Sequence, residues 1–556
     1  MEAGRSLTRG WRGLAGWTRR NWMPLAQAAF CCLVILPIAV RPGWPFDHDV
    51  RALFEGVEVF RRELAAGNLF PLWTPFCFNG HGSPMPLFYH RLFNTTAGAL
   101  ALPFGTPMGI KLALMLSLLL GSLGISAAAR ELGCRPAIRL WCGLVLPVAH
   151  YTFVNWLIRG STAELTAGML VPWLIYACLR MQSGKAFGAR LGVVLVLLFY
   201  GHIVVFLYSL PLLFLSTAMY VARRGGDRRG AMANLVHGFG AAGAIIVVGV
   251  LPDALAIRLV GREFNLERLS IFVPQHQFVP LWRYFADSFP WGHSWQGLSV
   301  EVGRFLVVSL LLCTGILLVK RSRPSLVSVG FLAAIAIVYF LFQLPAAATF
   351  YLALPVSQII QFPWRLLVYI TPAVILAVAV TAQAVLNLGG GWRYAAVAVL
   401  AATWTAQLSL AMTAYPADYQ WMSPEEIRQR TEHLDGPRAA GEFLPRRLAD
   451  RPLPPGAPLF RYEGCRPLSS SVDLDRLATV PFETVELKLE APGVCKIHFS
   501  QFVTSLVRVE PSAGGEVTRA ADETTDITLP PGTPTLRVGR RGVLQTLGYL
   551  WRSRAR

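Results

Sequence analysis

Charged residues are scarce in this sequence. Only 15% of its 556 residues are Asp, Glu, Lys or Arg, 54% are hydrophobic, and the mean hydropathy is +0.46. About a quarter of the residues are charged in an average soluble domain, so an ordinary soluble domain is excluded. The charge-poor runs cover residues 23–40, 110–129, 165–179, 191–220, 233–250, 305–319, 326–344, 366–388 and 394–413. Runs of about 20 residues match a hydrocarbon core about 30 Å thick, so the sequence predicts an all-α polytopic membrane protein with about eleven transmembrane helices.

Metal-binding patterns and internal repeats are also lacking. No Cys/His spacing resembles a zinc site, so no metal ligand and no cofactor is expected, while a need for a divalent cation stays open. Seven of the nine cysteines lie in or near predicted spans or the first loop, and we interpret them as small apolar packing residues. Cys465 and Cys495 lie in a predicted outer domain, where oxidation is permitted, and form either a disulfide or two free thiols.

Basic residues outnumber acidic ones by 51 to 32, which gives a formal net charge of +19. The clusters are Arg5/Arg9/Arg12/Arg19/Arg20, Arg130/Arg135/Arg139, Arg180/Lys185/Arg190, Arg223/Arg224/Arg228/Arg229, Lys320/Arg321/Arg323 and Arg393. Each cluster lies in a short connection or before the first helix, and with about eleven spans all of them fall on one side, which is the positive-inside bias. This bias places the N-terminus in the cytoplasm and explains the basic balance, so nucleic-acid binding is not expected. No small-residue cleavage site follows Val40, which argues against a cleavable signal peptide.

These patterns divide the chain into three parts. Residues 1–22 form a basic cytoplasmic arm, and residues 23–413 form the transmembrane domain with outer loops 41–95, 154–164, 257–303 and 345–365. Apolar residues at three- and four-residue spacing predict a helix over 50–64 that lies on the membrane surface. Residues 100–104 are interpreted as a re-entrant piece and 136–153 as one span. The run 191–220 is predicted to hold two helices that turn near Tyr200-Gly201-His202.

The composition changes after residue 413. Residues 414–556 have no further span and are rich in proline, charge and β-branched side chains. Within them, residues 484–489 and 495–499 alternate apolar with polar side chains, as strands do. This predicts a small β-rich extracytoplasmic domain, with the short apolar ending 543–551 as a surface anchor.

Ionisable side chains gather on the predicted outer side, where such groups usually mark a pathway or a site. An aspartate beside an apolar cavity suits a general base towards a hydroxyl acceptor, and we predict Asp49, then Asp47, as catalytic. Arginine forks suit a phosphate, so a lipid-phosphate substrate is favoured. The predicted substrate- and phosphate-binding residues are His48, Arg51, Tyr89, Arg159, Glu164, His202, His276, Arg283, Gln361 and Arg365.

Structural interpretations of the same residues stay open. Asp47 or Asp49 suits the cap of the helix that starts near Val50. Arg159 and Glu164 suit a structural ion pair, and His202 suits a hydrogen-bonded core position. A further set of side chains suits the membrane interface. That set is Arg365, Trp282, Trp291 and Trp295.

An ordered set of motifs covers nearly the whole chain. The motifs are His48-Asp49, Gly67…Phe70-Pro71-Leu72-Trp73, Gly80-His81-Gly82-Ser83-Pro84, Phe88-Tyr89, Arg159…Ala163-Glu164 with Pro172, Gly201-His202, Gln361-Phe362-Pro363-Trp364-Arg365 and Glu442-Phe443-Leu444-Pro445. This set resembles bacterial multispanning membrane proteins of the YfhO type, a group labelled by a 6-pyruvoyl-tetrahydropterin-synthase-related domain. That group resembles C-type (GT-C) glycosyltransferases.

The resemblance implies an inverting hexosyltransferase in the bacterial inner membrane, with the catalytic aspartate in the first outer loop. Its donor would be a polyprenyl-phosphate-linked sugar and its acceptor an envelope glycan, lipid or protein at the outer face. The aspartate maps to Asp49 before Asp47. Two positions depart from the pattern: Leu53 stands where many relatives have histidine, and Leu72 where many have arginine.

Two other functions stay in view. A transporter or flippase for a lipid-linked glycan would show charges through the membrane depth or paired internal repeats. A non-enzymatic scaffold for envelope glycan assembly would tolerate changes at Asp49. Here the polar residues crowd one face, which favours the transferase.

Overall fold

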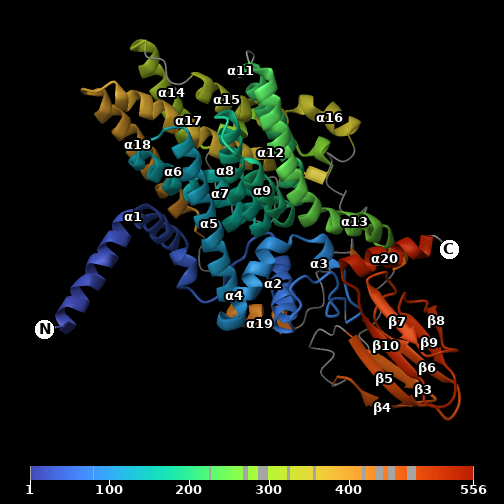
Figure 1. Cartoon of the computed structure of the whole chain (residues 1–556). Coiled ribbons are helices and arrows are strands. Elements are labelled where there is room, and N and C mark those ends of the chain that lie inside the picture. Colours follow the sequence, from blue (N-terminus) through green and yellow to red (C-terminus); the bar gives the residue numbers. More distant parts are fainter. Residues whose placement is uncertain are drawn as a thin grey trace.

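The computed structural model describes residues 2–78, 80–224, 227–266, 273–285, 299–321, 326–354, 359–415, 421–432, 443–448, 458–472 and 484–554. Figure 1 shows two bodies, a helical bundle and a lobe of β-strands, with the first loop and its short helices between them. The fold is therefore mostly helical with a C-terminal β region, as the sequence predicts.

The helices are α1 (Glu2–Ala39), α2 (Val50–Ala65), α3 (Met85–Phe88), α4 (Arg91–Phe104), α5 (Thr106–Glu131), α6 (Pro136–Val148), α7 (His150–Phe153), α8 (Thr162–Gln182), α9 (Gly188–Gly201), α10 (Ile203–Leu207), α11 (Ser209–Arg223), α12 (Arg228–Gly249), α13 (Leu251–Val260), α14 (Arg304–Val319), α15 (Leu326–Leu341), α16 (Ala348–Ala353), α17 (Leu367–Asn387), α18 (Trp392–Thr413), α19 (Pro424–Glu432) and α20 (Val543–Arg554). The strands are β1 (Trp44–Pro45), β2 (Trp421–Met422), β3 (Phe460–Glu463), β4 (Arg466–Ser470), β5 (Thr484–Glu490), β6 (Cys495–Phe499), β7 (Val507–Pro511), β8 (Glu516–Arg519), β9 (Thr525–Leu529) and β10 (Thr535–Arg540).

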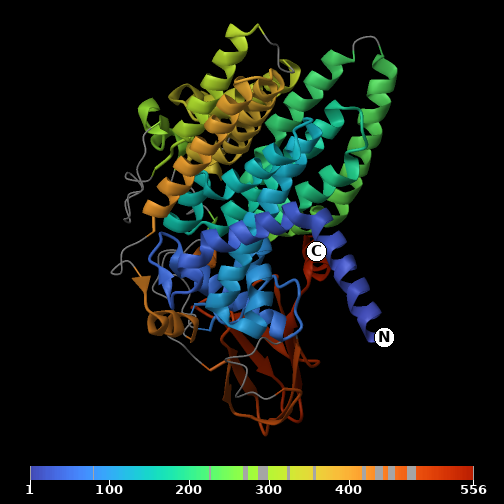
Figure 2. The same ribbon diagram turned by 90° about the vertical axis from the view of Figure 1, so that its left-hand side faces the viewer.

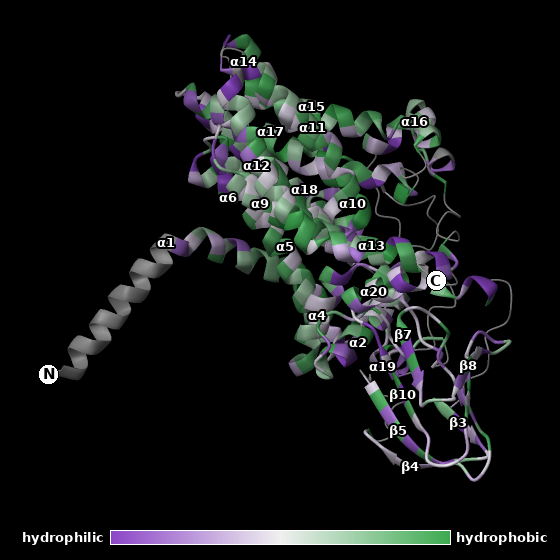
Figure 3. Cartoon of the chain, turned by 45° about the vertical axis from the view of Figure 1, so that its right-hand side comes forward, coloured by the Kyte–Doolittle hydropathy of each residue, from purple (hydrophilic) through white to green (hydrophobic). Residues whose placement is uncertain are grey.

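The bundle has the length and composition of a multi-pass membrane domain. Among the described residues, 7 helices are long and apolar enough to cross a membrane, or up to 9 if each of two bent pairs is one span. Two shorter apolar helices, α9 and α14, accompany them. Hydrophobic colours dominate the bundle, whereas the strands of the β lobe mix both colours (Figure 3). The number of about eleven spans stays a prediction.

The predicted span 136–153 is bent, and the predicted outer loop 154–164 is shorter than expected. Helix α6 ends at Val148, Ala149 is extended, and the chain bends by 44° before it continues through α7 into a π-helix at Val154–Ile158. Pro147 lacks an amide hydrogen, which favours a break at this point. Since α8 already begins at Thr162, the loop shrinks to residues 159–161 and is buried rather than outlying.

The turn predicted near Tyr200-Gly201-His202 is confirmed. Helix α9 ends at Gly201, His202 is extended with φ −163°, and α10 starts at Ile203. The long apolar run is thus split, and the imidazole of His202 is buried at the break.

The helix predicted over 50–64 exists as α2, but its apolar face packs against protein. Val50, Phe54, Val57 and Phe60 are buried, and α2 lies against α4 and α5. Residues 100–104 belong to α4, a continuous helix that begins at Arg91, and not to a separate re-entrant piece. A surface helix exposed to lipid is therefore replaced by a helix inside the protein.

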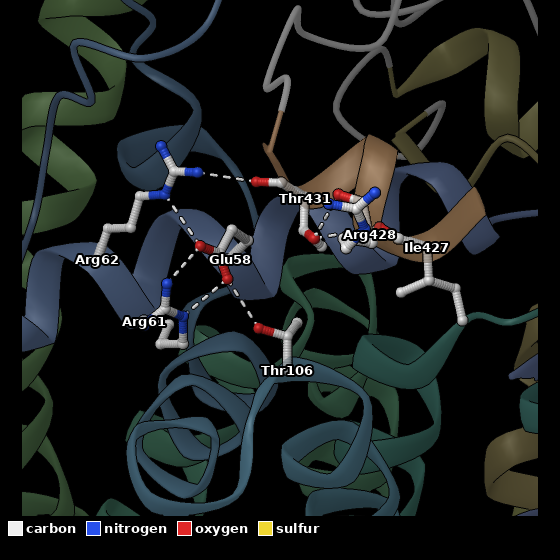
Figure 4. A network of polar contacts seen from close by, with 7 residues as sticks. All are labelled: Glu58, Arg61, Arg62, Thr106, Ile427, Arg428 and Thr431. Carbon is white, nitrogen blue, oxygen red and sulfur yellow. Dashed lines mark hydrogen bonds and ion pairs between the residues drawn. The ribbon is translucent and has the colours of Figure 1, made fainter. Parts of the chain in front are cut away.

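Buried charge holds α2 in place (Figure 4). Glu58 accepts hydrogen bonds from Arg61 Nη2 at 2.6 Å and from Arg62 Nε at 2.9 Å. Thr106, at the start of α5, donates to the same carboxylate at 2.7 Å. Arg62 Nη2 also reaches the carbonyl of Thr431 in α19 at 2.8 Å. One carboxylate thus joins α2 to the bundle, and one arginine joins it to α19.

Strand β2 pairs with β1 in a two-stranded antiparallel sheet, and strands β3 to β10 form two antiparallel four-stranded sheets. Their strand orders are β4-β5-β10-β7 and β3-β6-β9-β8. Buried and exposed residues alternate along β5, and the buried side chains of both sheets share one core, so the sheets pack as a sandwich. Both predicted strands are confirmed as β5 and β6. Cys465 and Cys495 form a disulfide.

The sandwich docks on the first loop, as Figures 1 and 2 show. Trp73 Nε1 donates to Gln501 Oε1 at 2.9 Å, and the His81 ring hydrogen-bonds the carbonyl of Ser500 at 2.6 Å. Arg540 and Glu63 form a buried ion pair at 2.7 Å. Gly82 has φ +86° and packs so tightly that a Cβ there would meet the Trp73 ring at 2.3 Å. The loop is therefore the hub between the two bodies.

Candidate functional site

The Asp47 carboxylate is buried, and both of its oxygens accept hydrogen bonds. Trp44 Nε1 donates to its Oδ2 at 2.7 Å, and the backbone amide of Asp49 donates to its Oδ1 at 3.1 Å. Gly160, with φ +66°, lies so close that a Cβ there would meet Asp47 Oδ1 at 2.0 Å. These contacts give Asp47 the role of fixing the turn before α2, which weakens its prediction as a second catalytic residue.

Asp49 is the N-cap residue of α2, but its side chain makes no cap hydrogen bond. Its backbone amide also donates to the carbonyl of Arg159 at 3.1 Å, and His48 N donates to the carbonyl of Ile158 at 3.2 Å. In the described part of the chain the Asp49 carboxylate accepts no hydrogen bond, and the residue is partly exposed. The backbone therefore holds Asp49 beside Arg159 and leaves its carboxylate available.

Arg159 and Glu164 form a fully buried ion pair. Arg159 Nη1 lies 2.9 Å from Glu164 Oε1 and also donates to Asn155 Oδ1 at 2.6 Å. Tyr151 donates to Glu164 Oε1 at 2.8 Å. The Arg159 guanidinium lies 4.7 Å from the centre of the Trp364 ring. The short spacing of five residues across the tight turn makes this pairing possible.

Arg365 adds a second cation to the same carboxylate. Its Nε lies 3.2 Å from Glu164 Oε2, and its side chain is 13% exposed whereas Arg159 and Glu164 are fully buried. Gln361, in a left-handed conformation with φ +58°, accepts a hydrogen bond from Arg365 Nη1 at 3.3 Å. Two cations share one carboxylate here, so the group has an excess positive charge that faces Asp49 or an incoming anion.

The electrostatics of Asp49 are set by burial and by this group. Burial raises the pKa of Asp49, while the charges of Arg159 and Arg365 lower it and Glu164 raises it. The net direction is upward from the ordinary value near 3.9. A carboxylate with a raised pKa is a stronger base than an exposed one, which suits proton abstraction from a hydroxyl.

His202 has an aromatic neighbour that the sequence prediction missed. The rings of His90 and His202 stack with centroids 4.1 Å apart, and Tyr89 lies 5.1 Å from His90. Burial and the nearby charge of Arg365 lower the pKa of His90 to about 4, so its ring is neutral at physiological pH. The structure thus assembles Tyr89, His90 and His202 on the flank of Arg365.

Other predicted site residues lie elsewhere or stay undefined. His276 is exposed on a 3₁₀ helix at Pro274–His276, and Arg283 is on another at Leu281–Phe285. In the described part of the chain neither is among the charges that act on Asp49. Arg51 lies in the first turn of α2. Trp291 and Trp295, and Glu442 of the last motif, lie outside the described residues.

Three contributors were not predicted. His90 directly follows the Phe88-Tyr89 motif, and its place between Tyr89 and Arg91 was the available signal. Tyr151 gave no signal, because it lies in the predicted span 136–153, and Asn155 lies in the predicted outer loop 154–164 but was not singled out there. No cluster of three or more His, Cys, Asp or Glu side chains able to hold a metal ion occurs among the described residues.

No known protein family and no curated protein matches the sequence. Among solved structures, the arabinofuranosyltransferase AftD from Mycobacteria is similar with a TM-score of 0.47 and 15% identity over 71% of this chain. The archaeal oligosaccharyltransferase AglB from Archaeoglobus fulgidus, in complex with an inhibitory peptide and a dolichol-phosphate, has a TM-score of 0.40 and 12% identity over 76%. This chain spans 27% of the first protein and 57% of the second. Membership of the YfhO-type group stays a prediction.

Proposed function

We propose that this chain is an integral membrane glycosyltransferase that moves a sugar from a polyprenyl-phosphate donor to a hydroxyl acceptor. The acceptor belongs to an envelope glycan, lipid or protein at the outer face of the bacterial inner membrane. The observation that carries the proposal is the placement of Asp49. Its carboxylate accepts no hydrogen bond in the described part of the chain and has a pKa raised by burial, and it stands beside two arginines that share one buried glutamate.

The carboxylate and the arginines divide the chemistry. Asp49 takes the proton from the acceptor hydroxyl as its oxygen bonds to the anomeric carbon. The bond from that carbon to the donor phosphate oxygen breaks, and its electron pair stays on the phosphate. Attack opposite the leaving group inverts the anomeric centre. The negative carboxylate of Asp49 receives the proton, and the positive arginines balance the negative charge that develops on the phosphate.

Arg365 is the candidate for contact with the phosphate, because it is the less buried of the two cations. Its planar fork binds phosphate oxygens bidentately. Arg159 is fully buried and acts through Glu164 as a positioning residue. Glu164 is held by Arg159, Arg365 and Tyr151, so it is not available as a base. His90 and His202 line the flank of Arg365 as neutral rings.

The proposal is tested in the cell by comparing envelope glycans and lipid-linked sugars between strains. A deletion strain is complemented with wild type, with Asp49→Asn, or with Asp227→Asn as a control that removes an exposed carboxylate at the start of α12. The deletion should lose a glycan and accumulate its polyprenyl-phosphate-linked sugar, and only Asp49→Asn should fail to restore it. Full restoration by Asp49→Asn would favour a flippase or a scaffold instead.

A further inference from the structure

A second cationic site lies at the end of the bundle opposite Asp49. Helix α5 begins at Thr106, beside the first loop, and ends at Glu131, so Arg130 in its last turn lies at the far end. An open cavity of about 500 Å³ lies there between α1, α5, α6 and α8. In the predicted topology this end faces the cytoplasm.

Two arginines line this cavity, the exposed Arg130 and the half-buried Arg139. The positive charge of Arg130 acts on Arg139. Within the described residues neither arginine has a carboxylate partner, because the neighbouring Glu131 is bound to Lys185 and Arg180. The Nε of Arg139 is buried and has no hydrogen-bond partner. Arg130 hydrogen-bonds the neutral side chain of Tyr176, which supplies no negative charge. Positive-inside topology explains arginines at this end, but not two guanidinium groups in one cavity without a carboxylate partner in the described part of the chain.

The rest of the lining combines polar and apolar surface. Gln27 donates to Ser126 Oγ at 2.5 Å, and Ser126 donates to the carbonyl of Arg139 at 2.7 Å, which builds a polar inner wall. The residues Trp22, Met23, Leu123, Ala127, Trp173 and Tyr176 form the aromatic and apolar remainder. Such a boundary between apolar helix surface and aromatic side chains is where lipid headgroups lie.

We propose that this cavity binds the headgroup phosphate of an anionic glycerophospholipid, held by Arg130 and Arg139. The phosphate supplies the negative charge that the two guanidinium groups lack, and the planar forks match its oxygens. The acyl chains run along the apolar walls of α1 and α5. A free phosphate shares this chemistry, but the position between membrane-spanning helices favours the lipid. The inference does not rest on the proposed transferase activity.

Native mass spectrometry of the purified full chain tests the proposal. Wild type, Arg130→Gln/Arg139→Gln and the control Arg223→Gln/Arg224→Gln are each incubated with dioleoylphosphatidylglycerol or dioleoylphosphatidylcholine in a neutral detergent. The control removes two exposed arginines that lie outside the cavity. Wild type and control should retain a phosphatidylglycerol adduct, and the double variant should retain at least about tenfold less, as expected for loss of more than 1.4 kcal/mol.

A second variant distinguishes loss of lipid binding from misfolding. Arg130→Glu places a carboxylate beside Arg139, so it should raise the thermal midpoint without lipid and abolish the phosphatidylglycerol adduct. The proposal is overturned if either cavity variant retains phosphatidylglycerol like wild type, or if phosphatidylcholine is retained equally. It is also overturned if inorganic phosphate displaces the lipid and stabilises the protein to the same degree.

Discussion

Arg159 Nη1 lies 2.9 Å from Glu164 Oε1, and both side chains are fully buried. Arg365 approaches the other oxygen of the same carboxylate at 3.2 Å. Glu164 therefore compensates two cations at once, and the position of Arg365 beside Asp49 depends on it. The first prediction concerns the removal of this carboxylate.

Glu164→Gln keeps the shape of the side chain but leaves two buried cations without their anion. Breaking a buried pair from one side costs about 3–5 kcal/mol, so the thermal midpoint in detergent should fall clearly. Arg428→Gln, which breaks an exposed pair in α19, is the control and should leave the thermal midpoint nearly unchanged. Equal effects of the two substitutions would show that the buried pair does not organise the site.

Gly160→Ala should disturb Asp47 and, through it, Asp49. The added Cβ would lie 2.0 Å from Asp47 Oδ1, and φ is +66°. Gly133→Ala is the matched control, because Gly133 has φ +78° and nothing within 4 Å of the added Cβ. Backbone strain should cost both variants about 1 kcal/mol or more in unfolding free energy. Only Gly160→Ala should lose additional stability and sugar transfer, measured by thermal unfolding and by a transfer assay.

The pH dependence of the protein should carry the signature of Asp49. Its folded pKa is raised by burial, so the folded state binds more protons than the unfolded state between about pH 3.9 and the raised value. Stability should therefore fall as pH rises through that window, whereas transfer should increase as Asp49 loses its proton. Asp49→Asn should remove this part of the slope in a series of thermal melts against pH. An unchanged slope would mean that Asp49 titrates normally.

The ion pair between Glu63 and Arg540 should fasten the β-sandwich to α2. Their atoms lie 2.7 Å apart, with the side chains 0% and 7% exposed. Arg540→Gln removes the cation from the buried Glu63 carboxylate, at a cost of about 3–5 kcal/mol. Limited proteolysis should then cut between the bundle and the sandwich faster than in wild type. The double variant Glu63→Gln/Arg540→Gln should recover part of the resistance, and equal sensitivity of single and double variants would contradict a coupled pair.

The sequence predicts the architecture well where the spacing of apolar residues and the local composition determine the secondary structure. Hydrophobic runs located the helices, and alternation located β5 and β6. The break at Gly201-His202 was predicted because a polar, flexible dipeptide interrupts an apolar run. Both cysteines of the outer domain were found, but only the structure decides that they are bonded.

The errors have physical causes. The apolar residues of α2 have the same spacing whether they face lipid or protein. Their spacing therefore does not predict that α4 and α5 cover this face. Residues 154–158 read as a loop because of Asn155, whose amide is used inside the fold by Arg159. Asp47 and Asp49 are two residues apart and chemically identical. The difference between them is visible only in the structure, where Trp44 and the Asp49 amide donate hydrogen bonds to the Asp47 carboxylate and leave the Asp49 carboxylate available.

The central claim is that Asp49 acts as the base of a sugar transfer, and the most direct measurement is the transfer rate of purified protein. Wild type, Asp49→Asn and the control Asp227→Asn are compared with a polyprenyl-phosphate-linked sugar and the acceptor identified from the deletion strain. Asp49→Asn should fold like wild type and lose about 10²–10⁴-fold in rate, the contribution of a general base. A rate equal to that of wild type in a folded Asp49→Asn protein would contradict the account.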